Sequence, residues 1–185
     1  MANATTIENF YNQAFIKQFA RDFHFRVKQI TVQGVQVNGE TDLIYAKTAA
    51  LPGRDIENKV VNYAGQAFNV SGKSSYPGSE SYSIEFFNDA SLDLRSKFED
   101  ISRKTFDNET TTGAYGLAGP DSIITLEQIA LDLSVVNTIQ LIGVSIRNIG
   151  EIQYQIADGT GEVTSFPVSF SYHFYKDFTF GGNFA

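Results

Sequence analysis

Residues 165–174 alternate strictly between bulky apolar side chains and small polar ones. The apolar members are Phe166, Val168, Phe170, Tyr172 and Phe174. Because successive side chains of a β-strand point to opposite faces of its sheet, this pattern predicts a strand with one core face and one small, polar face. Pro167 has no N–H group to donate, so we expect an edge position or a bulge there.

Shorter alternating segments occupy much of the remaining chain. We expect strands at residues 23–32, 43–50, 59–63, 66–71, 81–87, 122–133, 138–146 and 152–157, with turns at Asn38-Gly39, Ala64-Gly65 and Val136-Asn137. The 16 Phe, 9 Tyr and 15 Gly favour pleated sheets and turns over helix bundles. The sequence therefore predicts a mostly β fold, a sandwich or barrel-like single domain.

Two helices are expected beside the sheets. Thr5 and Glu8 have the form of a capping box, and apolar residues follow at helical spacing: Ile7, Phe10, Tyr11, Ala14, Phe15 and Phe19. This apolar stripe packs on its own domain in one interpretation and on a neighbouring subunit in the other. Asn88-Asp89 can cap a second helix, on which Leu94, Phe98 and Ile101 share one face that should lie across a sheet.

The length of 185 residues is sufficient for one sizeable core, so we expect a single domain over residues 1–185. Within it we distinguish an N-terminal helical arm (1–22), a long loop (104–121) and a C-terminal tail (176–185). The loop is rich in Thr and Gly and lacks periodicity, which predicts a segment that becomes ordered on assembly. The tail is expected to be mobile unless a neighbour holds it.

The formal net charge of −7 gives no general electrostatic basis for binding nucleic acid. The chain has no cysteine, which excludes disulfides, thiolate metal sites and cysteine nucleophiles. We find neither a leader sequence nor an apolar segment long enough to cross a bilayer, so we expect an unexported protein with no membrane partner.

No pattern in the sequence indicates catalysis. Gly72-Lys73-Ser74 lacks the preceding glycine of a phosphate-binding loop, and we expect His24 and His173 on the surface, away from any ligand cluster. We therefore predict that the protein is not an enzyme and uses no cofactor or metal. Two alternatives stay open, a monomeric β-sandwich that binds a small ligand and a hydrolase that uses two carboxylates.

The spacing N-D-x-x-x-D-x-R-x-K-F occurs from Asn88 to Phe98, at the start of the second expected helix. In chain order it follows Leu51-Pro52-Gly53 and precedes the segment from Gly143 to Glu151 and the aromatic final strand. Together these features resemble the tail tube proteins of contractile-tailed bacteriophages, whose relatives form the inner tubes of injection and secretion systems. The resemblance covers roughly residues 23–175.

The resemblance implies a homohexameric ring whose subunits join their sheets into one β-lined channel, with rings stacked inside a sheath. The implied function is a structural one in a phage tail, where the channel conducts DNA without binding it specifically. The implied partners are the sheath, baseplate and tail-terminator proteins, and the implied location is a virion assembled in the host cytoplasm. The alternative is the tube of a contractile injection or secretion system that carries protein effectors.

Polar strand faces are candidates for the channel wall, because carboxylates would keep DNA from adhering to it. We assign Asn69, Ser71, Ser83 and Glu85 to the wall. The other interpretation places them on the outer surface under the sheath. Contacts between subunits are expected in the arm and the long loop, at Ile7, Phe10, Tyr11, Phe15, Thr111 and Tyr115.

Overall fold

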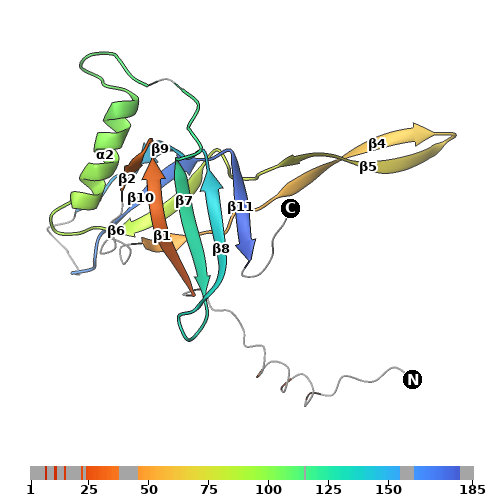
Figure 1. Ribbon diagram of the computed structural model, residues 1–185, viewed down its shortest axis with the longest axis horizontal. Helices are drawn as coiled ribbons and strands as arrows, with labels where there is room; N and C mark the ends of the chain where they lie inside the picture. The colour runs from red at the N-terminus through yellow and green to blue at the C-terminus, as the bar shows by residue number, and fades with distance from the viewer. Residues whose placement is uncertain are drawn as a thin grey trace.

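The computed structural model describes residues 7, 11, 15, 22, 24–37, 46–114, 116–154 and 161–179. The fold is mostly β, with antiparallel strands in a five-stranded sheet (order β11-β8-β7-β1-β2), a four-stranded sheet (order β3-β6-β10-β9) and a separate two-stranded hairpin (β4-β5) (Figure 1). The strands are β1 (Phe25–Val32), β2 (Val35–Gln36), β3 (Ala46–Ala49), β4 (Asp55–Tyr63), β5 (Gln66–Ser75), β6 (Tyr82–Phe87), β7 (Ile123–Ile129), β8 (Val135–Ile142), β9 (Ser145–Ile149), β10 (Ser165–Ser171) and β11 (Phe174–Thr179). Helix α2 spans Asp93–Thr105.

The core lies between the two larger sheets. The predicted alternation of β10 is confirmed, because Phe166, Val168 and Phe170 are fully buried while the residues between them are more exposed. Side chains of the five-stranded sheet, including Ile124 and Leu141, join the same buried cluster. One hydrophobic core thus holds both sheets together.

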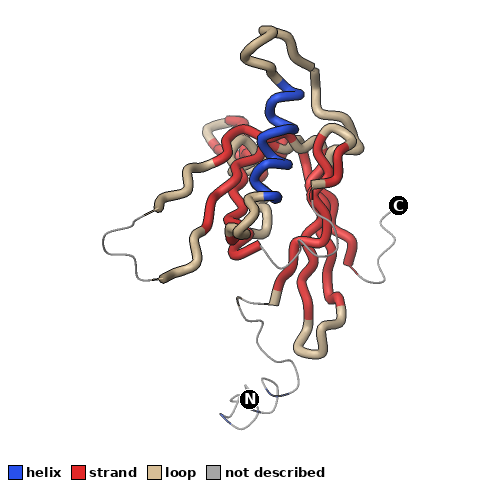
Figure 2. Tube along the Cα trace, turned by 90° about the vertical axis from the view of Figure 1, so that its left-hand side faces the viewer, coloured by secondary structure: helices blue, strands red, loops and turns tan. Residues whose placement is uncertain are grey.

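Helix α2 packs on the four-stranded sheet, as the sequence predicts (Figure 2). Leu94, Phe98 and Ile101 are buried, and the Phe98 ring centroid lies 5.4 Å from that of Phe86 and 5.9 Å from that of Phe170. At the start of the helix, an oxygen of the Asp89 side chain accepts a hydrogen bond from the backbone N–H of Asp93 (3.1 Å). The expected buried face is confirmed, whereas the N-cap position is Leu92 (φ 59°), which makes no side-chain cap hydrogen bond, and not Asn88 or Asp89.

Two tight turns differ in how well the sequence predicts them. Ala64 and Gly65 have φ of 49° and 80° and close the β4–β5 hairpin, as expected. Gln33 and Gly34, with φ of 51° and 73°, close a β1–β2 hairpin that the sequence analysis missed. The expected turn at Asn38-Gly39 lies outside the described residues.

Two predicted strands are each divided between the two sheets. Residues 138–146 were expected to form one strand, but Gly143 (φ 71°) separates β8 in the five-stranded sheet from β9 in the four-stranded sheet. The final alternating segment changes sheets in the same way at Tyr172-His173. The two crossings adjoin, since the N–H of His173 donates to the carbonyl of Ile142 (2.9 Å) and the His173 ring fills the space a side chain at position 143 would need.

Several local predictions are wrong. The expected turn at Val136-Asn137 lies in β8, and the chain reverses at residues 130–134 instead, where Asp132 accepts hydrogen bonds from Ser134. Residues 152–154, expected in a strand, belong to none. His24, expected on the surface, is buried at the end of the five-stranded sheet, where its carbonyl accepts from the N–H of Ile129 (3.1 Å).

Pro167 does not lie on an edge strand, because β10 runs between β6 and β9. The ladder between β10 and β9 ends at the pair Val168 and Ile149 and does not include Pro167, so position 167 needs no N–H group for this ladder. Instead, the Pro167 carbonyl accepts from the N–H of Gly150 (2.7 Å). The proline ring fits because Gly150 has no Cβ, which would lie 2.5 Å from Pro167 Cγ.

The long loop and the tail begin later than expected. Helix α2 extends to Thr105, so residues 104–105 of the predicted loop are helical, while the described residues from 106 to 122 contain no helix or strand. Residues 176–179 of the predicted tail belong to β11.

Two buried tyrosine hydroxyls differ in their partners. The Tyr82 hydroxyl donates to the carbonyl of Ala50 (2.6 Å), whereas no partner for the Tyr172 hydroxyl occurs among the described residues. Burial, and then the neighbouring Tyr172, raise the pKa of Tyr82 well above its usual value. Burial, and then Tyr175 and Tyr76, also raise the pKa of Tyr172, so both groups are neutral hydroxyls at ordinary pH.

This difference predicts opposite effects of removing each hydroxyl. Tyr82→Phe should lower the free energy of unfolding by about 1 kcal/mol, because it leaves a carbonyl unsatisfied. Tyr172→Phe should leave stability unchanged or raise it, because it removes a buried hydroxyl without a protein partner. Urea unfolding of both variants checks the pair, and an equal loss in both would contradict it.

Candidate assembly interface

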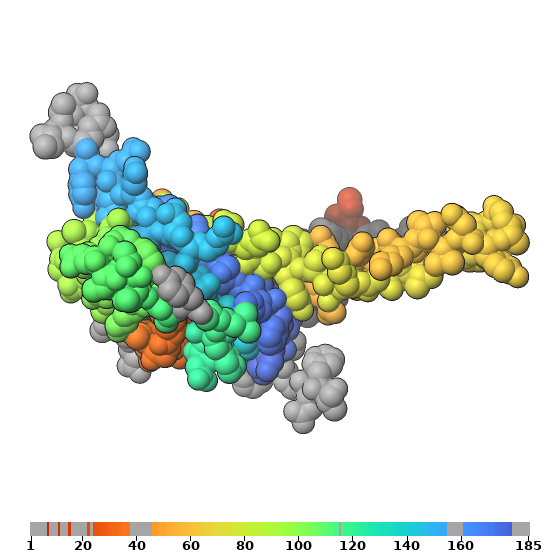
Figure 3. Space-filling view, turned by 90° about the horizontal axis from the view of Figure 1, so that it is seen from above, coloured from red at the N-terminus to blue at the C-terminus, as the bar shows by residue number. Residues whose placement is uncertain are grey.

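The β4–β5 hairpin projects far from the body of the subunit (Figures 1 and 3). Its strands pair from Asp55 with Ser75 to Tyr63 with Gln66, and every residue of both strands is exposed. The hairpin is longer than the sequence predicts, since β4 begins at Asp55 and β5 ends at Ser75. It is therefore a large element that receives little support from its own core.

The two faces of the hairpin differ in polarity. Directly paired residues share a face, so Val61 and Phe68 lie together on one face with Tyr63 and Val70. This apolar face is 49% exposed at Val70, 50% at Phe68, 52% at Val61 and 76% at Tyr63. It also carries two polar side chains, Lys59 opposite Val70 and Gln66 opposite Tyr63. The opposite, polar face carries uncharged side chains around Val60: Asn58, Asn62, Asn69 and Ser71.

The exposed apolar face is the main candidate surface that the sequence analysis missed. The alternation of Phe68 and Val70 with Asn69 and Ser71 was correctly identified, but the apolar side was interpreted as facing the core of the same domain. An isolated two-stranded hairpin is marginally stable in water, and an exposed apolar patch on a monomer marks an interaction site. Each of these large side chains contributes about 1.5–3 kcal/mol when it is fully buried.

The four predicted wall residues do not lie together. Asn69 and Ser71 are on the polar face of the hairpin, whereas Ser83 and Glu85 are on β6 in the four-stranded sheet. On β6 the predicted alternation is confirmed, with Tyr82, Ile84 and Phe86 buried. Ser83 and Glu85 consequently point away from the core.

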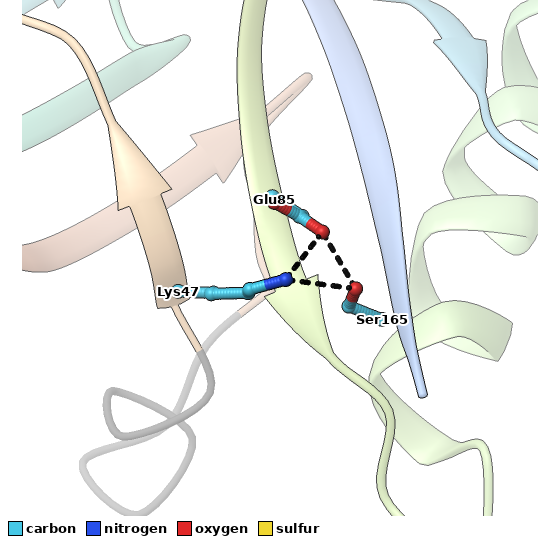
Figure 4. A network of polar contacts seen from close by, with 3 residues as sticks. All are labelled: Lys47, Glu85 and Ser165. Atoms are coloured by element: carbon cyan, nitrogen blue, oxygen red, sulfur yellow. Dashed lines mark hydrogen bonds and ion pairs between the residues drawn. The ribbon is translucent and has the colours of Figure 1, made fainter. Parts of the chain in front are cut away.

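Glu85 belongs to a polar network that joins three strands (Figure 4). Its Oε1 atom lies 2.9 Å from Nζ of Lys47 on β3 and accepts a hydrogen bond from the Ser165 hydroxyl on β10 (2.6 Å). The Ser165 hydroxyl and the Lys47 ammonium lower the pKa of Glu85. The carboxylate is thus kept ionised and paired, and its contribution to stability is lost only as the pH falls through this lowered value.

The outward face of the four-stranded sheet carries small, polar side chains along β6, β10 and β9. Ser83 pairs with Ser169 across β6 and β10, and the hydroxyls of Ser145 and Ser171 lie 2.7 Å apart across β9 and β10. The serines of β10 were identified from the sequence as a polar face. The position of these serines opposite Ser83 could not be predicted from the sequence, because β6 and β10 pair over a long distance along the chain.

The predicted contact residues of the arm and loop are exposed where they are described. Ile7, Tyr11 and Phe15 are helical and 88%, 67% and 74% exposed, and their four-residue spacing places them on one helix face. Thr111 is exposed in the long loop. Phe10 and Tyr115 lie outside the described residues.

The N-D-x-x-x-D-x-R-x-K-F motif has structural contacts. Asn88 Nδ2 donates to the hydroxyl of Thr164 (3.3 Å), which ties the end of β6 to the start of β10. Arg95 Nη1 donates to the carbonyl of Gly150 (2.6 Å), its Nε pairs with Glu99 (2.9 Å), and its guanidinium lies over the Phe166 ring. The Arg95 contacts with Gly150 and Phe166 fix α2 against the sheet, and none of the contacts of the motif requires a ligand.

The described residues offer little to a hydrolase mechanism. They contain no cluster of three metal-ligating side chains. As a separate point, no helix among the described residues is long and apolar enough to cross a membrane. A pocket of about 210 Å³ is lined by residues that include His24, Leu51 and Glu127. Burial acts to raise the pKa of Glu127, but the hydrogen bonds from Lys28 and Arg26 and their charges outweigh it and lower the pKa below its usual value. This carboxyl is therefore held as an ion pair and is poorly suited to act as a general acid.

The comparison with solved structures identifies the fold. A chain of the baseplate of the anti-feeding prophage, solved with six-fold symmetry, matches with a TM-score of 0.61 over 89% of this chain and 98% of its own, at 12% sequence identity. A chain of the sheath-tube complex of the extracellular contractile injection system PVC, in the extended state, matches with a TM-score of 0.57 over 91% and 97%, at 9% identity. This protein has the fold of the tube proteins of contractile injection systems. A chain of the sheath/tube terminator of PVC matches with a TM-score of 0.54 over 87% and 97%, at 8% identity.

The likeness to these tube proteins is one of structure. No protein-family model matches the chain, and no curated protein matches its sequence. The tube fold nevertheless extends over nearly the full length of each solved chain, including the first two at 98% and 97%. The match thus includes whole subunits and is not limited to a common sheet motif.

Proposed function

We propose that this protein is a structural subunit of the inner tube of a contractile phage tail and has no catalytic activity. The single observation that carries the proposal is its fold, shared over whole chains with components of contractile injection systems. Homohexameric rings, the arrangement implied by the sequence resemblance, are supported by the six-fold symmetry of the prophage baseplate. All of residues 1–185 form one tube domain in this proposal.

The exposed parts of the subunit support assembly with copies of itself. The apolar face of the hairpin needs a cover, and a neighbouring subunit of a stacked ring supplies it. The two larger sheets end at β11 and β2 and at β3 and β9, and joining these edge strands to the sheets of neighbours would close the ring and remove the unpaired edges. The arm residues Ile7, Phe10, Tyr11 and Phe15 and the loop residues Thr111 and Tyr115 contact other subunits in this arrangement.

Sheath, baseplate and terminator proteins are the proposed partners of the tube. The support is that the solved relatives come from a baseplate, a sheath-tube complex and a sheath/tube terminator. The proposed location is the phage tail, assembled in the host cytoplasm, and the proposed cargo is DNA that passes without specific binding.

A second candidate function has a specific observation in its favour. Two of the solved structures with the same fold come from the anti-feeding prophage and from an extracellular contractile injection system. In that case the same tube would carry protein effectors. The two functions share the subunit and its assembly and differ only in cargo.

Electron microscopy tests the proposal directly. Purified protein at high concentration, or particles that contain it, should show hollow tubes built of stacked rings in negative stain. A protein that stays monomeric at all concentrations, and is absent from tailed particles, would disprove the function. Nuclease treatment of intact particles then separates the cargoes, because enclosed DNA is protected and protein effectors are found by mass spectrometry.

We also propose that Asn69, Ser71, Ser83 and Glu85 face the channel. Glu85→Lys is then expected to leave tubes intact but to slow DNA release, most strongly at low salt. The change introduces a cation beside Lys47 and removes the carboxylate that balances it, so phosphates would be held at the wall. Release is measured as the rate of DNA ejection from particles over a range of salt concentrations.

Glu85→Gln is the matched control for this prediction, because it removes the negative charge without adding a positive one. Its ejection rate should depend on salt less strongly than that of Glu85→Lys. A cysteine at position 85 that reacts with a bulky reagent from the outside of intact tubes would contradict the placement. The absence of any native cysteine makes that labelling specific.

A further inference from the structure

Four tyrosines gather where the β4–β5 hairpin leaves the body of the subunit. Tyr76 follows the last residue of β5, and Tyr82 begins β6. Tyr172 lies between β10 and β11, at the point where the chain changes sheets, and Tyr175 lies in β11. We call these four residues the tyrosine anchor.

The outgoing root of the hairpin, at its β5 end, is held by rings and by backbone. The Tyr76 ring packs edge-on against Tyr175, with centroids 5.4 Å apart, and lies 6.5 Å from Tyr172. In the turn that follows, the Ser79 carbonyl accepts from the N–H of Tyr172 (2.9 Å), and the Glu80 carbonyl accepts from Arg147 (2.6 Å). This end of the hairpin is thereby attached to both larger sheets.

The incoming root, at the β4 end, is held by the same cluster. The Tyr82 hydroxyl donates to the carbonyl of Ala50 (2.6 Å), just before the segment that leads into β4. The Tyr82 ring packs edge-on against Tyr172, with centroids 6.0 Å apart. Tyr172 thus contacts the tyrosines of both roots and couples them.

The strands of the hairpin are not held against the body of the subunit by burial of their own, because every residue of β4 and β5 is exposed. We infer that the tyrosine anchor fixes the direction in which the hairpin leaves the subunit, which makes Tyr76 a positioning residue for assembly. The role of Tyr76 in assembly rests on the proposed function, whereas the effect of the anchor on the direction of the hairpin does not. If hairpins must meet neighbours at one angle, an anchor at the root lowers the entropy lost on assembly.

The anchor is tested by a distance measurement on the unassembled subunit. Because the chain has no cysteine, Asn62→Cys near the hairpin tip and Asp100→Cys on α2 can be spin-labelled specifically. Pulsed electron paramagnetic resonance should give a narrow distribution of distances between the two labels. Tyr76→Ala should broaden and shift it, while Tyr76→Phe, which keeps the ring, should preserve it.

Circular dichroism and thermal unfolding of the same variants show whether the body of the subunit is retained. A distribution unchanged by Tyr76→Ala in a folded subunit would disprove the anchor. So would equal broadening in Tyr76→Phe, because the ring contacts would then not be responsible.

Tube formation by the unlabelled variants tests the positioning role separately. Tyr76→Ala should lose tubes or shorten them, and Tyr76→Phe should restore them. Normal tubes from Tyr76→Ala, with the distances altered, would overturn the role in assembly. Failure of the unmodified protein to form tubes would count against the proposed function, while the distance measurement would still decide whether the anchor exists.

Discussion

Phe68→Asp is expected to abolish tube formation while leaving the subunit folded. Phe68 is 50% exposed at the centre of the apolar face of the hairpin, so a carboxylate costs little in the free subunit. In the proposed tube a neighbour would cover the same position, and the change would then both remove apolar burial and bury a charge. Each contact should lose about 3 kcal/mol or more, roughly a hundredfold in affinity, and this loss recurs in every subunit. Sedimentation and negative-stain microscopy measure the assembly.

Asn69→Asp is the matched control for this change. It introduces the same charge at the adjacent position, but on the polar face of the hairpin. Tubes of near-normal length should form from Asn69→Asp and not from Phe68→Asp. Equal behaviour of the two variants would show that the apolar face is not the contact surface. Matching circular dichroism spectra would confirm that both subunits are folded.

The strand faces were predictable because alternation is a local property. Ile84 and Phe86 on β6, and Phe166 and Phe170 on β10, are buried as the pattern predicts. The same holds for the buried face of α2, where the spacing of Leu94, Phe98 and Ile101 already specifies which side meets the sheet.

The passage of a strand from one sheet to the other was not predictable in the same way. Polar and apolar residues continue to alternate through Tyr172 and His173, although the strand changes sheets there. The physical cause is a contact between two positions far apart in the chain, Gly143 and His173. The His173 ring fits there only because position 143 has no side chain. Nothing in the local sequence around either position predicts its contact with the other.

The candidate interface shows a second limit of sequence patterns. Alternation separates an apolar face from a polar one, but it does not say whether the apolar face is covered by the same chain. Phe68 and Val70 therefore look like core residues in the sequence, whereas the structure leaves them about half exposed. The pairing of Glu85 with Lys47 and Ser165 was missed for a related reason, since the three residues come from three strands far apart in the chain.

Phe98→Ala is expected to cause a large loss of stability within the subunit. The Phe98 side chain is fully buried between α2 and the four-stranded sheet, beside the rings of Phe86 and Phe170. Removing it leaves a cavity that a rigid sheet cannot close, at a cost of about 3–5 kcal/mol. For a domain of this size the midpoint of thermal unfolding should fall by roughly 6–20 °C, measured by differential scanning calorimetry of the unassembled protein.

Phe178→Ala makes the same chemical change at a site on β11 that is 48% exposed. Since little apolar area is lost there and no closed cavity forms, the midpoint should fall by only a fraction of the shift seen for Phe98→Ala. Comparable shifts in the two variants would contradict the packing described for α2. A large shift confined to Phe98→Ala would show that Phe98, the last residue of the motif from Asn88, acts through stability, on the same helix that Arg95 ties to Gly150.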